Sequence, residues 1–89
     1  MTGSEAEALR HCAAGSVLFH SGLWGGPMGF VWADADGAAA GHVPQWESEA
    51  LTILERKRLV AIEPTGGARD ARVVVTPIGS LHLTQDLAA

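Results

Sequence analysis

The residues best suited to bind a metal ion are one cysteine and four histidines: His11, Cys12, His20, His42 and His82. Their spacings match no zinc signature, in which closely spaced pairs of Cys or His ligands recur. His11 and Cys12 are neighbours on a predicted helix, so their side chains point about 100° apart. For the same reason His11 is poorly placed to act as a general base for the Cys12 thiol. We therefore predict no metal site, no cofactor and no catalytic residue.

The segment Asp34-Ala35-Asp36-Gly37 has the carboxylates and the glycine of a calcium-binding loop. If Gly37 is aligned with the invariant glycine of such a loop, the first and last ligand positions fall on Trp32 and Val43, whose side chains carry no oxygen. The segment therefore predicts a hairpin turn.

A glycine-rich stretch covers residues 22–29. It lacks the Gly-Lys-Ser/Thr ending of phosphate-binding loops, so we predict an irregular surface loop. Trp24 and Met28 lie in this loop. Large apolar side chains in such a position are typical anchors for a partner protein.

Length and composition indicate one small domain over residues 1–89. The chain has 89 residues, of which 47% are hydrophobic, and this suits one globular core. A core of this size gives limited stability, so a homodimer is an expectation. No apolar run reaches the roughly 18 residues that cross a bilayer, and the polar N-terminus does not read as a signal peptide. A single cysteine, Cys12, favours a reducing compartment, so we expect a cytoplasmic protein that does not bind a membrane.

The formal net charge of −4 argues against a general nucleic-acid binder. The charge is unevenly distributed, however, because most of the basic residues lie in the second half of the chain: Arg56, Lys57, Arg58, Arg69 and Arg72. The high Arg and Ala content is typical of a high-GC bacterial or phage genome.

The first half predicts a helix followed by short strands. A capping box from Ser4 to Glu7 and a stop signal at Gly15 predict a helix over about residues 4–14. A brief strand follows at residues 17–19. Residues 30–43 predict a further hairpin, with a short helix over residues 36–41 as the alternative, because the alanine-rich returning segment has poor strand propensity.

The second half carries the strongest periodic pattern, which predicts a helix over residues 45–58. Its apolar face is expected to contain Trp46, Ala50, Ile53 and Leu54, with Leu51 at the margin, and Trp46 is therefore expected in the core. Two strands, at 59–63 and 71–75, then form a hairpin. A closing helix covers residues 77–86, with Thr76 as its N-cap and Pro77 at its first position. The expected fold class is α+β.

Two stretches, Leu54–Val60 and Arg69–Gly79, resemble the winged-helix regulators of the MarR and PadR type. In those families a helix ends in a Leu-x-x-x-Gly-Leu-Val-like corner, a β-hairpin wing follows, and a Leu-Thr-x-x-Gly-like turn opens the next helix. The resemblance covers about residues 45–83. It implies a small winged-helix-like domain that acts as a dimer through its terminal helices.

The corner and the last turn have clear roles in such a fold. Leu59 would lie under the helix, Thr76 would cap the last helix, and Gly79 would let that helix pack closely on the wing.

The chain differs from the family pattern in two places. Arg58 stands where the corner glycine is usual, and residues 22–43 predict loop and hairpin in place of the helix that precedes the recognition helix.

The resemblance implies a DNA-binding transcriptional regulator. The residues that would contact DNA are Gln45, Ser48 and Thr52 in the major groove, Arg56 and Lys57 at the helix end, and Arg69 and Arg72 on the wing. Glu49 lies on the same helix face, and Glu47 and Glu55 are close by. Carboxylates are repelled by phosphates unless they accept a hydrogen bond from a cytosine amine, and this counts against DNA. Arg56 and Lys57 also suit the negative end of the helix dipole without any ligand.

The alternative is a winged-helix-like protein-interaction module, for example a phage or accessory factor that binds a host protein, with Trp24 and Met28 as its anchors. Neither interpretation is enzymatic. A continuous positive stripe through Arg56, Lys57, Arg69 and Arg72 would favour DNA, whereas an exposed apolar patch around Trp24 would favour a protein partner.

Overall fold

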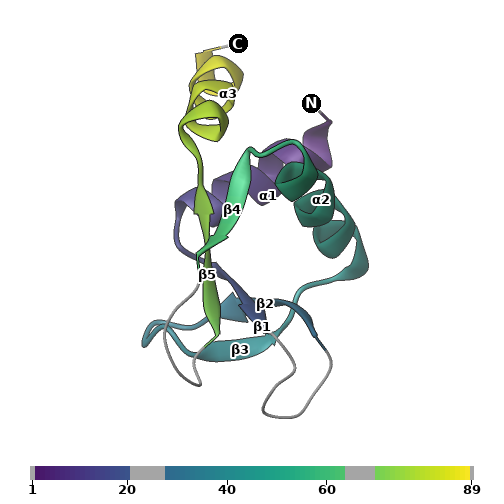
Figure 1. Cartoon of the computed structure of the whole chain (residues 1–89), viewed down its shortest axis with the longest axis vertical. Coiled ribbons are helices and arrows are strands. Elements are labelled where there is room, and N and C mark those ends of the chain that lie inside the picture. Colours follow the sequence, from purple (N-terminus) through teal and green to yellow (C-terminus); the bar gives the residue numbers. More distant parts are fainter. Residues whose placement is uncertain (1, 21–27, 64–69, 89) are drawn as a thin grey trace.

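The computed structural model describes residues 2–20, 28–63 and 70–88, with side chains described up to residue 84 (Figure 1). In this part of the chain the elements are α1 (Gly3–Ala13), β1 (Val17–His20), β2 (Gly29–Ala33), β3 (Ala39–His42), α2 (Gln45–Arg56), β4 (Val60–Glu63), β5 (Ala71–Val75) and α3 (Pro77–Ala88). The five strands form one antiparallel sheet in the order β3-β2-β1-β5-β4. The fold class is α+β, as expected from the sequence.

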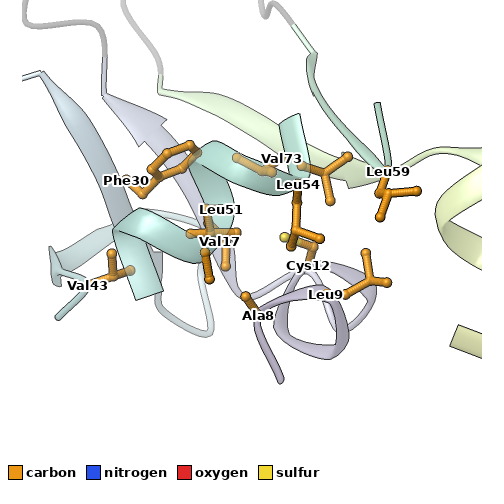
Figure 2. Packing of buried hydrophobic residues seen from close by; sticks show 12 residues of the cluster. Ala8, Leu9, Cys12, Val17, Phe30, Val43, Leu51, Leu54, Leu59 and Val73 are labelled. Atoms are coloured by element: carbon orange, nitrogen blue, oxygen red, sulfur yellow. The ribbon is translucent and has the colours of Figure 1, made fainter. Parts of the chain in front are cut away.

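The helices α1 and α2 pack side by side, while α3 continues beyond the end of β5 and also contacts α1 (Figure 1). The core lies between these two helices and one face of the sheet (Figure 2). It is formed by Ala8, Leu9, Cys12, Val17, Phe30, Val43, Ala50, Leu51, Leu54, Leu59, Val60 and Val73. None of the described helices is both long and apolar enough to cross a membrane.

The N-terminal helix begins two residues earlier than the capping box at Ser4 predicted. Thr2 is the N-cap: its hydroxyl accepts from the Glu5 amide at 3.1 Å, and the Glu5 carboxylate accepts from the Thr2 amide at 3.5 Å. Both Thr2-x-x-Glu5 and Ser4-x-x-Glu7 fit the motif. The first one is used because it turns Glu5 inward, where it is 6% exposed. Gly15 follows the helix with a φ of 74°, as its position predicted.

The predicted hairpin at residues 30–43 is confirmed as β2 and β3, and the alternative short helix is wrong. The Asp34 carboxylate holds the turn because it accepts from the amides of Asp36 and Ala38, both at 2.9 Å. Gly37 adopts a φ of 80°, which glycine accommodates easily. An Asx turn closed by a left-handed glycine thus overcomes the low strand propensity of the alanines.

The predicted buried face of α2 is wrong at two positions. Trp46 and Ile53 are 40% and 39% exposed, whereas Leu51 and the charged residue Glu47 are fully buried. The buried face is therefore centred on Glu47, Ala50, Leu51 and Leu54. A helical wheel places a carboxylate outside because it contains no information about a partner elsewhere in the chain. Here that partner is His11.

The corner between α2 and β4 has the left-handed turn of the family pattern, although an arginine occupies it. Arg58 has a φ of 61°, a conformation that costs an L-residue roughly 1 kcal/mol. The Leu59 amide, which follows, donates to the Leu54 carbonyl at 2.9 Å, and the Leu59 side chain is 4% exposed. The chain therefore reverses sharply from α2 into β4.

Thr76 and Gly79 fasten α3 to this corner. The Thr76 amide donates to the Leu59 carbonyl at 3.0 Å, and its hydroxyl donates to the Arg58 carbonyl at 2.7 Å. The same hydroxyl accepts from the Gly79 amide at 3.1 Å, which confirms the predicted N-cap. A Cβ on Gly79 would lie 2.0 Å from the Leu59 carbonyl oxygen. Only glycine fits here without a shift of the backbone.

We expect Gly79→Ala to lower the free energy of unfolding by about 2 kcal/mol, because the methyl group must displace backbone and not a flexible side chain. Urea unfolding followed by circular dichroism measures this change. Ser80→Ala is the matched control, since Ser80 is exposed on the same helical turn. Equal stability of the two variants would contradict the close packing of α3 on the corner.

Candidate interaction surface

The outer face of α2 carries four of the residues implied to contact DNA. Gln45, Ser48, Thr52 and Arg56 follow each other along this face at helical spacing, and each is exposed or half-buried. Two of these side chains already form hydrogen bonds within the helix. Gln45 donates to Glu49 at 3.2 Å, and the Thr52 hydroxyl donates to the Ser48 carbonyl at 2.9 Å. The structure thus aligns these residues and places a carboxylate among them.

The cations do not form one stripe. The Lys57 ammonium turns toward α1, where it lies 3.2 Å from the Glu5 carboxylate. Arg72 alternates with the core residue Val73 along β5, so it lies on the face of the sheet opposite α1 and α2. Glu63 is the cross-strand neighbour of Arg72 on that face. Arg56 is therefore separated from Arg72 by the sheet, and the DNA contacts implied by the resemblance fall on two different surfaces.

Two apolar side chains interrupt the polar outer face of α2. Trp46 and Ile53 lie two turns apart on the same side of the helix, and each leaves about two fifths of its surface in solvent. Ile53 borders a shallow hollow that Ser48, Glu49, Thr52 and Arg56 complete. We call the set Gln45, Trp46, Ser48, Glu49, Thr52, Ile53 and Arg56 the α2 outer face. It combines an apolar centre with a mixed polar border.

A buried ion pair fixes the orientation of this face. The Glu47 carboxylate has no exposed surface, and its Oε1 lies 2.8 Å from Nδ1 of His11 on α1. The imidazole is one-third exposed and packs edge-on against Trp32 with ring centroids 5.2 Å apart. The second oxygen of Glu47 has no hydrogen-bond partner. The pair therefore joins α1, α2 and β2 at the start of α2, and His11 supplies the single hydrogen-bond contact of the buried carboxylate.

A second ion pair joins the same helices at their other ends. Glu5, at the start of α1, is 7% exposed in its side chain and accepts from Lys57, just after α2, at 3.2 Å. Burial raises the pKa of Glu5, but the hydrogen bonds from Lys57 and Thr2 and the positive charge of Lys57 outweigh it, so the pKa lies below its ordinary value of 4.5. The two helices are therefore held antiparallel at both ends.

The thiol of Cys12 is buried in the core. Burial, and then the negative charge of Glu47, raise the pKa of the Cys12 thiol to about 12, so it stays protonated and is a poor nucleophile at neutral pH. His20 pairs with Asp70 at 2.7 Å and ties the end of β1 to the segment before β5. Among the described residues no three His, Cys, Asp or Glu side chains converge to hold a metal ion.

Some of the residues that the sequence predicted to contact a partner do not lie on the α2 outer face. Met28 is 69% exposed at the start of β2. Trp24, the proposed partner of Met28 in a contact patch, and Arg69 on the wing lie outside the described residues. Their part in any site stays a prediction.

Comparison of the chain with protein-family models, with curated protein sequences and with solved structures gives no match.

Sequence patterns did not single out Trp46, Ile53 and Glu47 as surface or pairing residues. The available signal was the charge pattern around Glu47: it lies three and four residues before Ala50 and Leu51, and seven before Leu54. That spacing places Glu47 in the middle of an apolar face. A buried carboxylate needs a partner, and His11 on the other predicted helix is that partner.

We expect His11→Ala to lower the free energy of unfolding by about 3 kcal/mol, because it leaves the Glu47 carboxylate buried without its partner. His42→Ala, on the exposed strand β3, should change stability by less than about 0.5 kcal/mol. Adding Glu47→Met to His11→Ala should recover part of the loss. Denaturant unfolding of the four proteins measures these values, and equal effects of the two histidine variants would show that the pair does not stabilise the fold.

We expect stability to fall in acid as Glu5 takes up a proton. Its folded pKa is below 4.5, so its contribution is complete above pH 4.5 and is lost as the pH falls through the lower folded value. Lys57→Gln removes the cation that lowers the pKa, so the difference in unfolding free energy between wild type and variant should shrink from pH 6 to pH 3. Urea titrations at several pH values measure this. A difference that stays constant with pH, or that Arg56→Gln reproduces, contradicts the assignment.

Proposed function

We propose that this chain is a non-catalytic protein-interaction module that binds a partner protein through the α2 outer face. The observation that carries the proposal is the outward position of Trp46 and Ile53 on a helix whose other side is fixed by core packing and two ion pairs. Isolated exposed apolar residues are common. Two on one rigid face, bordered by polar side chains, have the anatomy of a protein interface.

The magnitudes favour a protein partner over DNA. Covering the exposed part of Trp46 alone removes about 100 Å² of apolar surface from water, which contributes about 2 kcal/mol. On the α2 outer face, by contrast, Arg56 is the sole cation and Glu49 offsets it. A single phosphate contact changes the logarithm of the binding constant by only about 0.9 per decade of salt. Non-specific DNA binding of such a surface is therefore weak.

The compartment we propose is the cytoplasm, where the single free cysteine stays reduced.

A second copy of the chain is one partner that the α2 outer face accommodates. The mass of a cross-linked product distinguishes such a homodimer from a complex with another protein.

We expect a photo-cross-linking residue at position 53 to form a discrete covalent adduct in the cells that produce the protein. The same residue at Ala40, exposed on β3, is the matched control and should form none. Adding Trp46→Ser should lower the adduct yield at least tenfold, because removal of an interface tryptophan weakens binding by about 2 kcal/mol or more. No adduct at position 53, or equal adducts at both positions, would contradict the proposal.

A second candidate function is DNA binding by a winged-helix-like domain. The observations that favour it are the alignment of Gln45, Ser48 and Thr52 and the left-handed corner at Arg58, followed by the β4–β5 hairpin, in the order of the family pattern. If this function is correct, binding to a random DNA duplex should weaken with salt, and Arg56→Ala should reduce the salt slope by about one. No binding at low salt would exclude DNA binding by this chain alone.

A further inference from the structure

A groove runs beside β4, the edge strand of the sheet. The end of α2 forms one wall and the start of α3 the other. Its lining includes the apolar side chains of Ile62, Pro77 and Ile78 and the cations Arg56 and Arg58. Ile78 is 53% exposed. The groove thus combines apolar and cationic lining residues.

The strand beside the groove has unused backbone hydrogen-bonding groups. Leu59 and Thr76 face each other, and the Thr76 amide donates to the Leu59 carbonyl at 3.0 Å. In an antiparallel ladder the bonded pairs alternate, so Ala61 bonds with Val74 and the amide and carbonyl of Ile62 point away from β5. No backbone hydrogen bond among the described residues uses these two groups. Ile62 therefore offers one donor and one acceptor at the edge of the sheet.

Arg58 is unusual for its position. It occupies the left-handed region with a φ of 61°, where glycine is more stable. No ion pair within the described part of the chain involves Arg56 or Arg58. Non-glycine residues held in such a conformation concentrate at functional sites. The guanidinium of Arg58 is thus present at a conformational cost and is available at the groove.

We propose that this groove binds an extended, acidic segment of the partner protein. The segment adds to the sheet at Ile62, as in other cases of strand addition, and lays an apolar side chain against Pro77 and Ile78. A carboxylate on the segment pairs with Arg56 and Arg58, since guanidinium and carboxylate groups form strong charge-assisted hydrogen bonds. The inference rests on the proposed function, because it names the chemistry of the segment that a partner inserts.

An acidic peptide fits this groove better than a nucleic acid does. Its main chain matches the donor and acceptor of Ile62, and its apolar side chains match Ile78. A single strand of nucleic acid needs aromatic side chains for base stacking, and the groove has none among its lining residues.

The test uses the full chain and a fluorescent peptide of sequence Gly-Asp-Ile-Asp-Val-Asp-Ile-Gly, with binding followed by anisotropy. We expect the wild type to bind it and Arg58→Gly to bind about tenfold more weakly, as expected for loss of a charge-assisted pair. Arg58→Gly should at the same time unfold at higher urea, because it relieves the left-handed strain. The loss of binding then cannot result from unfolding. Arg10→Gln removes an arginine from α1 and should leave binding unchanged.

Three further probes test strand addition and charge. The same peptide with N-methylated central residues, a peptide with Lys in place of Asp, and a short DNA duplex should all bind at least tenfold more weakly. The proposal is wrong if the N-methylated peptide binds equally, if the Lys peptide or the duplex binds better, or if Arg58→Gly has no effect. If the peptide fails to bind while the cross-link from position 53 persists, the groove assignment alone fails. If both are absent, the proposed function fails with it.

Discussion

Glu47 has no exposed surface, and its Oε1 lies 2.8 Å from one ring nitrogen of His11. Without this partner the buried carboxylate would carry an uncompensated desolvation cost, so the contact stabilises the orientation of α2 in which Glu47 faces inward. Because His11 is placed to receive the carboxylate, the helix keeps Leu51 and Leu54 inside and presents the tryptophan. The surface that we propose for partner binding is thus a consequence of an ion pair on its opposite side.

The corner after α2 has a similar role for the second surface. Arg58 reverses the chain, Leu59 anchors the reversal in the core, and Thr76 bonds to both of their carbonyls. The start of α3 is therefore fastened to the end of α2 and not only to its own strand. Both walls of the groove beside β4 depend on this junction.

Much of the fold was predictable from the sequence because its signals are local. Caps, turns and breakers such as Gly15, Asp34, Thr76 and Pro77 act within a few residues, and the helices and strands begin and end close to where these residues placed them. The left-handed turn at Arg58 was not predictable from the residue type, because an arginine stands where a glycine is usual. The exposed face of α2 was not predictable in this way. It depends on a contact between residues 11 and 47, and the periodicity of either helix alone contains no information about the other.

The distinction between local signals and contacts across the chain applies to charge as well. The net charge of −4 describes the whole chain and makes nucleic acid an unfavourable partner. It does not describe the groove, where two arginines lie next to an open strand edge while Lys57 is neutralised by Glu5 and Arg72 lies across the sheet. Of the four described cations in the second half of the chain, the fold thus uses Lys57 in an ion pair, places Arg72 across the sheet and leaves Arg56 and Arg58 at the groove. The acidic segment that we propose would meet these two arginines locally, whatever the net charge of the chain.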